Sequence, residues 1–125
     1  MAEKINRPLS PHLQIYNLPL TGILSIAHRI TGVLLSAGLI FVVYLFSVLA
    51  AGPVSYSAMQ DVMDIGIFRL VYWLFIYALF FHLCHGIRHL IWDSGQSFEL
   101  VTLNRYAMME IIASVVLTVI AFILF

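Results

Sequence analysis

Long apolar runs alternate with short polar stretches along this chain. Apolar residues dominate the segments from about 23 to 51, 68 to 92 and 106 to 125. A helix rises about 1.5 Å per residue, so each run is long enough to cross a hydrocarbon core of about 30 Å. The pattern predicts an all-α integral membrane protein, a three-helix up-down-up bundle in a single domain, residues 1–125.

The polar stretches separate the predicted spans. Gly52 and Pro53 are expected to end the first span, because glycine suits the end of a helix and proline disfavours a helical residue before it. Residues 54–66 are expected to form a loop with a small interfacial helix, and residues 93–97 a turn. Residues 99–105 are too polar to cross a membrane, which limits the start of the third span.

The amino-terminal stretch differs from the rest of the chain. Pro8, Pro11 and Pro19 lie within the first 20 residues and favour an extended segment on the membrane surface or on a partner. The stretch lacks the apolar core and the small-residue cleavage site of a secretory signal. We therefore expect a short amino-terminal surface segment that is retained.

The composition excludes several classes of function. Hydrophobic residues make up 62% of the chain and charged residues only 10%, which excludes an ordinary soluble domain. The formal net charge is zero, so no basic patch suggests a nucleic acid partner, and membrane lipid is the expected surrounding. Cys84 is the only cysteine and cannot hold an iron–sulfur cluster. Any such cluster, or any flavin, must belong to another chain.

The basic residues predict an orientation. Lys4, Arg7, Arg88 and Arg105 lie near the amino terminus and the second loop, whereas Arg69 lies near the first loop. Basic residues are enriched on the cytoplasmic side of membrane proteins. We therefore expect a cytoplasmic amino terminus and second loop, with the carboxyl terminus on the opposite side.

Three histidines mark the end of the second predicted span. His82, His85, Gly86 and His89 follow helical spacing and share one face. Ionisable residues inside a span usually face protein and carry function. His82 lies deepest and is the best candidate for a metal or haem ligand, although it could also hydrogen-bond to a neighbouring helix or line a water cavity. His85 and His89 are expected to be solvated near the interface.

Two charged residues near these histidines have simpler interpretations. Arg88 is expected to be an interfacial anchor, and Glu110, one turn into the third predicted span, is expected to reach headgroups or water. A haem held by two histidines needs one imidazole on each face, and His82 is the only deep candidate here. A second ligand would have to come from another subunit.

A polar stripe follows the early turns of the first span. Ser25, His28, Arg29, Gly32 and Ser36 have helical spacing and should face protein. His28 and Arg29 could pair with haem propionates, and Gly86 of the second span would allow a flat ring to approach. Ser25 and Arg29 could bind a quinone through a hydroxyl and a guanidinium. On the residues alone, helix packing and a snorkelling arginine are the simpler interpretation of this pair.

Three motifs resemble one known family over essentially the whole chain. These are RPLSPHLQIY at 7–16, SIAHRITG at 25–32 and HLCHGIRHLIWD at 82–93. They are similar to the cytochrome b membrane-anchor subunit of succinate dehydrogenase, respiratory complex II. The resemblance implies that His82 is an axial ligand of one haem b, shared with a second membrane-anchor subunit that supplies the other histidine. It also implies that Ser25 and Arg29 line the ubiquinone pocket and that His28 lies near the haem propionates.

The resemblance also implies partners and a location. Electrons would pass from succinate through a flavoprotein subunit and an iron–sulfur subunit to ubiquinone, so this subunit of succinate:quinone oxidoreductase would carry no flavin or cluster of its own. The complex would lie in the bacterial inner membrane, or in the mitochondrial inner membrane if the chain is organelle-encoded. The alternatives are the anchor of a fumarate reductase and a non-redox structural or channel-like subunit.

Overall fold

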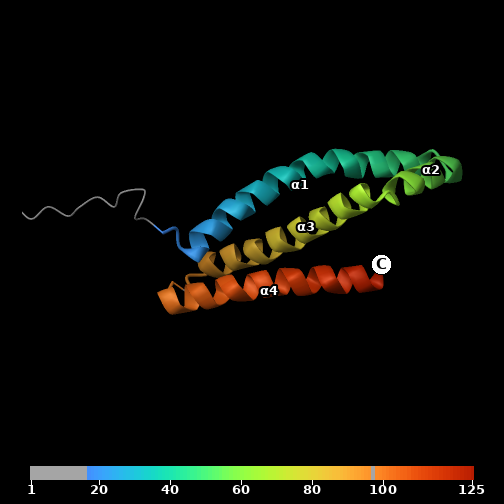
Figure 1. The fold of residues 1–125 in the computed structure, drawn as a ribbon. Coiled ribbons are helices and arrows are strands. Elements are labelled where there is room, and N and C mark those ends of the chain that lie inside the picture. The colour runs from blue at the N-terminus through green and yellow to red at the C-terminus, as the bar shows by residue number, and fades with distance from the viewer. Residues whose placement is uncertain (1–16, 97) are drawn as a thin grey trace, which may run out of the picture.

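The computed structural model describes residues 17–96 and 98–125, which form helices and no strand. The expected surface segment lies largely outside the described residues. Three of the helices are long and apolar enough to cross a membrane, as the sequence predicts. Figure 1 shows these three lying lengthwise beside one another, with the shorter α2 at one end. The helices are α1 (Leu20–Ala50), α2 (Pro53–Met63), α3 (Gly66–Asp93) and α4 (Leu100–Leu124).

The break between α1 and α2 follows from the local sequence. Gly52 has a φ of 98°, a conformation that glycine adopts without the steric cost of a Cβ. Pro53 is the first residue of α2, where its missing N–H leaves no helical hydrogen bond unmade. The polar residues 53–63 therefore form a separate short helix instead of extending α1.

The last helix begins earlier than the predicted third span. α4 starts at Leu100 instead of residue 106, and the backbone N–H of Leu103 donates to the Glu99 carbonyl at 2.8 Å. Polarity limits how deep a residue can lie in a membrane, but it does not prevent a helix from extending beyond the apolar region. Glu110 consequently lies in the third turn of α4 and not at its start.

α3 packs antiparallel to both long neighbours. His28 near the start of α1 stacks on His82 near the end of α3, with ring centroids 4.0 Å apart. Further along, a Cβ added to Gly38 of α1 would overlap the Phe75 ring of α3, so the two helices approach closely there. On the other side, Trp73 of α3 contacts Phe122 of α4, with ring centroids 4.9 Å apart. The three long helices thus alternate in direction along the bundle.

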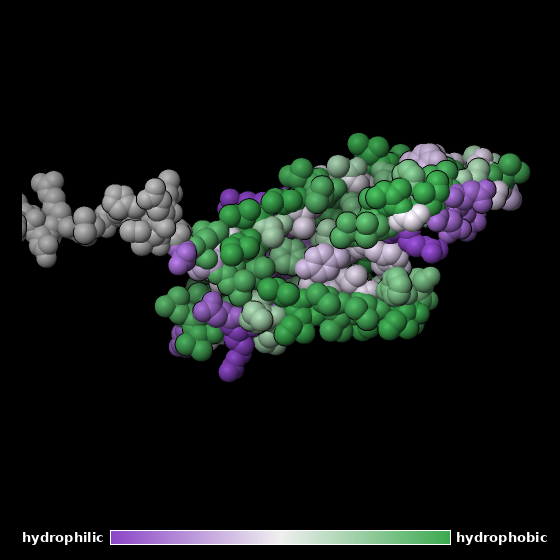
Figure 2. Space-filling view, viewed as in Figure 1, coloured by the Kyte–Doolittle hydropathy of each residue, from purple (hydrophilic) through white to green (hydrophobic). Residues whose placement is uncertain are grey.

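The buried core of this chain is small. Leu24 of α1, Phe81 of α3 and Ala107 of α4 form its centre, at the end of the bundle that carries the histidines. In the most apolar 18-residue stretch of each long helix, only 6%, 11% and 17% of the residues are buried. Figure 2 shows a mainly hydrophobic face with hydrophilic residues toward the two ends. Such a surface needs lipid or partner helices around it.

Candidate functional site

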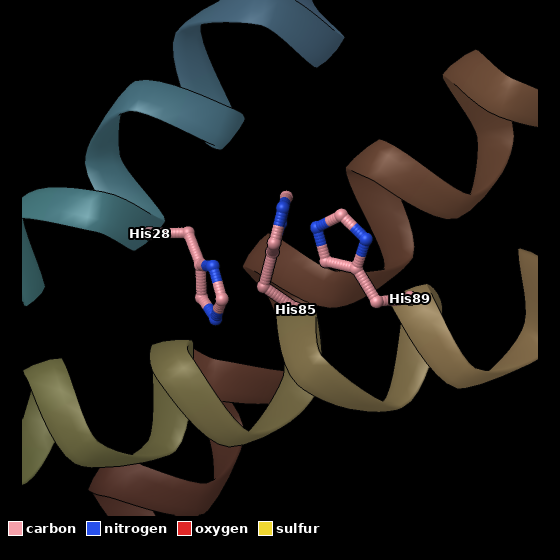
Figure 3. Close-up of side chains that lie close together, drawn as sticks. All are labelled: His28, His85 and His89. Atoms are coloured by element: carbon pink, nitrogen blue, oxygen red, sulfur yellow. The ribbon is translucent and has the colours of Figure 1, made fainter. Parts of the chain in front are cut away.

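Four histidine rings gather where α1 begins and α3 ends. The His28 ring centroid lies 4.0 Å from that of His82, 4.5 Å from that of His85 and 5.6 Å from that of His89. His28 comes from α1 and the other three from α3, whose helical spacing aligns them on one face. Figure 3 shows His28 reaching from α1 toward His85, with His89 beside it. The structure therefore brings His28 of α1 against the histidine face of α3.

The Thr31 hydroxyl contacts the imidazole of His82. The Thr31 hydroxyl donates to the His28 carbonyl at 2.9 Å and lies 3.2 Å from His82 Nδ1. A hydroxyl has one hydrogen, so when it donates to the carbonyl it accepts from His82 Nδ1, which then carries the proton. His82 Nε2 then keeps its lone pair, which is the form that a metal requires. No role was predicted for Thr31 from the sequence, although it lies three residues from His28.

The two glycines near His82 differ in the space around them. A Cβ on Gly32 of α1 would lie 3.2 Å from His82 Cε1, so any larger residue there would crowd the imidazole. A Cβ on Gly86, one turn after His82, would meet nothing within 4 Å. A bound haem needs a lone pair on its histidine ligand and open space for its flat macrocycle. His82 Nε2 and the space beside Gly86 fit these two needs.

Three residues are buried where the sequence predicted exposure. His85 was expected to be solvated, Arg88 to be an interfacial anchor, and Glu110 to reach headgroups or water. Their residue exposures are 0%, 3% and 5%. Glu110 accepts a hydrogen bond from His85 Nδ1 at 2.8 Å and one from Arg88 at 3.0 Å. Arg88 also donates to the Leu103 carbonyl at 3.0 Å. The expectations were wrong because they measured depth from the ends of the apolar runs, whereas the packing of α3 on α4 decides burial here.

The buried cluster balances its own charge. Arg88 is paired with Glu110 at 3.0 Å, and its guanidinium lies 4.5 Å from the centroid of the Trp92 ring. The charges of Arg88 and Glu110 therefore compensate each other. Buried charges persist when they are paired and hydrogen-bonded in this way.

Two imidazole nitrogens at this site have no hydrogen-bond partner within the described residues. They are Nε2 of His28 and Nε2 of His85, and both atoms are buried. Buried polar atoms are normally satisfied, so an unpartnered one needs an explanation such as a ligand or ion. The free nitrogens mark the space between α1 and α3 as a place where a ligand can bind.

The predicted quinone residues occupy the adjoining part of α1. Ser25 is partly buried and Arg29 is exposed on this chain. The polar stripe that was expected to face protein is therefore divided, since His28 faces α3 whereas Arg29 and Ser36 are exposed. A pocket of about 570 Å³ lies at the opposite end of the bundle, beside α2, and neither Ser25 nor Arg29 lines it. A quinone bound at Ser25 and Arg29 would consequently need the surface of a partner subunit to enclose it.

Comparisons with known proteins identify relatives over most of the chain. The family model described as "Succinate dehydrogenase/Fumarate reductase transmembrane subunit" matches residues 3–121. The succinate dehydrogenase cytochrome b556 subunit of Paracoccus denitrificans is 37% identical over 120 residues, covering 96% of this chain and 92% of the relative. The cytochrome b560 subunit of Reclinomonas americana is 37% identical over 128 residues, covering 97% and 88%. That of Chondrus crispus is 31% identical over 115 residues, covering 86% and 87%.

Proposed function

Because the chain belongs to the family of succinate dehydrogenase and fumarate reductase transmembrane subunits, we propose that it is the haem b-binding membrane anchor of a succinate dehydrogenase. The observation that carries this proposal is the contact of the Thr31 hydroxyl with His82 Nδ1 at 3.2 Å, which leaves His82 Nε2 available to a metal. The relatives are named as cytochrome b subunits, which agrees with a haem ligand in this chain.

His82 would hold the haem iron from this chain, and a second membrane-anchor subunit would supply another histidine. Haem b, when bound, contributes one-electron redox chemistry. Thr31 holds the His82 ring in a fixed orientation, and the space beside Gly86 admits a flat ring against α3. His28 stacks on His82, and its Nε2 has no partner among the described residues. His28 and Arg29 can therefore pair with the haem propionates.

Ser25 and Arg29 would serve the reduction of ubiquinone. A quinone takes up two electrons and two protons to become a quinol, and negative charge develops on its oxygens before the protons arrive. The Ser25 hydroxyl can donate to a carbonyl oxygen, and the Arg29 guanidinium can stabilise the developing anion. Ser25 and Arg29 are four positions apart on α1, so both side chains can reach the same bound quinone. The exposure of Arg29 on this chain leaves it available to a pocket completed by partner subunits.

The arrangement also supports an orientation for the chain in its membrane. Ser25, Arg29 and the histidines all lie at the end of the bundle where α1 begins and α3 ends. The excess of basic residues near that end favours the cytoplasmic side of a bacterial membrane, or the equivalent side of the mitochondrial inner membrane. Electrons would arrive there from the flavoprotein and iron–sulfur subunits, which oxidise succinate.

Purification of the intact complex through a tag on this chain tests the proposal. We expect the flavoprotein, the iron–sulfur subunit and a second anchor to co-purify, with a haem b band in the visible spectrum and succinate-dependent reduction of ubiquinone. A non-redox structural subunit would show no haem band. A fumarate reductase anchor, which the same family includes, would instead co-purify with a low-potential quinone and support fumarate reduction by its quinol.

A further inference from the structure

His28, His85 and His89 form a cluster that the proposed function does not fully use. Each offers one imidazole nitrogen, and the three nitrogens lie within 4.8 Å of one another. Figure 3 shows the three rings gathered between α1 and α3. The Nε2 atoms of His28 and His85 are buried and without a hydrogen-bond partner, so two of the three rings present free nitrogens.

The buried partners of His85 determine what its free nitrogen can bind. Glu110 is compensated by Arg88 and accepts the Nδ1 proton of His85 at 2.8 Å. A neutral imidazole whose Nδ1 carries the proton has a bare lone pair on Nε2. A carboxylate that accepts the far N–H of a histidine is the usual outer partner of a metal-binding histidine. With its Nδ1 proton hydrogen-bonded to Glu110, His85 can bind a cation through Nε2 but cannot donate a hydrogen bond from that atom.

We propose that His28, His85 and His89 bind a divalent zinc ion. Imidazole nitrogens suit zinc, and three histidines with a water or hydroxide in the fourth position are an established zinc geometry. Nitrogens that share a tetrahedral zinc at about 2.0–2.1 Å are roughly 3.3 Å apart, so the rings must turn and draw together slightly from their present spacing. The pairing of Arg88 with Glu110 balances the fixed charges beside the site before the ion binds.

Zinc binding would link α1 to α3, because His28 belongs to the first helix and the other two ligands to the third. The consequence for redox chemistry rests on the proposed function. There His28 is assigned to the propionate edge, and zinc would compete for the same ring. The site would then act as an inhibitory one, which withdraws His28 from the neighbourhood of His82.

Zinc titration of the intact purified complex, after chelator treatment, tests the site directly. The bound zinc is counted by elemental analysis, and its ligands are identified by X-ray absorption. We expect one zinc ion per anchor that is lost in His85→Gln, with nitrogen neighbours at about 2.0–2.1 Å. Zinc affinity should fall by about tenfold to a hundredfold in Glu110→Gln, which keeps all three ligands but removes the carboxylate that His85 Nδ1 and Arg88 share. Cys84→Ala is the matched control and should bind zinc as the parent does, since the adjacent thiol is not part of the cluster.

His89→Gln provides a second variant if His85→Gln fails to assemble. Equal zinc binding in the parent complex and in the variant that assembles would overturn the proposal, as would the absence of any stoichiometric zinc in the parent. The haem spectrum of the zinc-free complex is recorded in parallel. A normal spectrum without zinc binding rejects the zinc site alone, whereas a missing haem band rejects the proposed function independently.

Discussion

His85 of α3 and Glu110 of α4 are joined by a buried hydrogen bond of 2.8 Å, although 25 residues separate them in the sequence. Glu110 also pairs with Arg88, so a single carboxylate satisfies two basic side chains of the neighbouring helix. Removal of that carboxylate would leave a buried arginine without its counter-charge, and such a change is strongly destabilising.

We predict that Glu110→Gln lowers the stability of the assembled complex by about 3–5 kcal/mol. The measurement is the thermal midpoint of subunit dissociation in detergent. The double variant Glu110→Leu with Arg88→Leu should lose less stability than Glu110→Gln, because no unpaired charge then stays buried. A Glu110→Gln complex that dissociates at the parent temperature would show that this ion pair contributes nothing.

Gly38 and Phe75 define a second contact that can be tested. A Cβ at Gly38 would overlap the Phe75 ring, so Gly38→Ala must push α1 away from α3 or turn the ring. We expect a loss of about 1–3 kcal/mol, again read as a lower dissociation midpoint. Gly66→Ala is the matched control, because a Cβ there meets nothing within 4 Å. Equal midpoints for the two variants would contradict the close packing of α1 on α3.

Thr31→Val should alter the haem without removing its ligand. The valine keeps the shape of the side chain but cannot accept the His82 Nδ1 proton at 3.2 Å. Loss of this outer partner lowers the basicity of the ligand, so we expect a higher haem midpoint potential and about tenfold to a hundredfold weaker haem retention. Redox titration of the purified complex measures the shift. Thr31→Ser should restore the parent potential, and a parent-like potential in Thr31→Val would exclude the hydrogen bond.

Ser25→Ala and Arg29→Leu should impair the reduction of ubiquinone by succinate. Loss of one preorganised donor typically costs about 2.7–4 kcal/mol, or roughly a hundredfold to a thousandfold in rate. Reduction of a water-soluble dye, which takes electrons before they reach this chain, should stay near normal. A parallel fall in both activities would make the residues assembly elements, and unchanged activities would mean that the quinone binds elsewhere.

The apolar runs were sufficient to predict the long helices, because length and hydropathy determine which segments can cross a membrane. α4 begins before the predicted third span, because residues 100–105 are helical although Thr102, Asn104 and Arg105 are polar. The adjacency of His82 to α1 was partly foreseeable from the spacing of His28 and Gly32, although the contribution of Thr31 was not.

The pairing of Glu110 with His85 and Arg88 could not be predicted from either helix alone. It depends on how far α3 and α4 rotate about their axes, which packing determines and helical periodicity does not. A usable signal was nevertheless present. Arg88 lies three residues after His85, on one face of α3, and Glu110 interrupts an otherwise apolar stretch of the next helix. An acid and a base at similar depth on consecutive helices indicate a buried pair.

The central claim is that His82 ligates haem b, and the visible and low-temperature EPR spectra of an assembled His82→Leu complex test it most directly. The account predicts that the low-spin haem signal is lost or becomes high-spin, while Cys84→Ala, two residues further along α3, keeps the parent spectrum. Combining His82→Leu with His28→Leu excludes a substitute ligand from the stacked neighbour. A low-spin spectrum that survives unchanged in both His82 variants would contradict the assignment and, with it, the proposed role of this site.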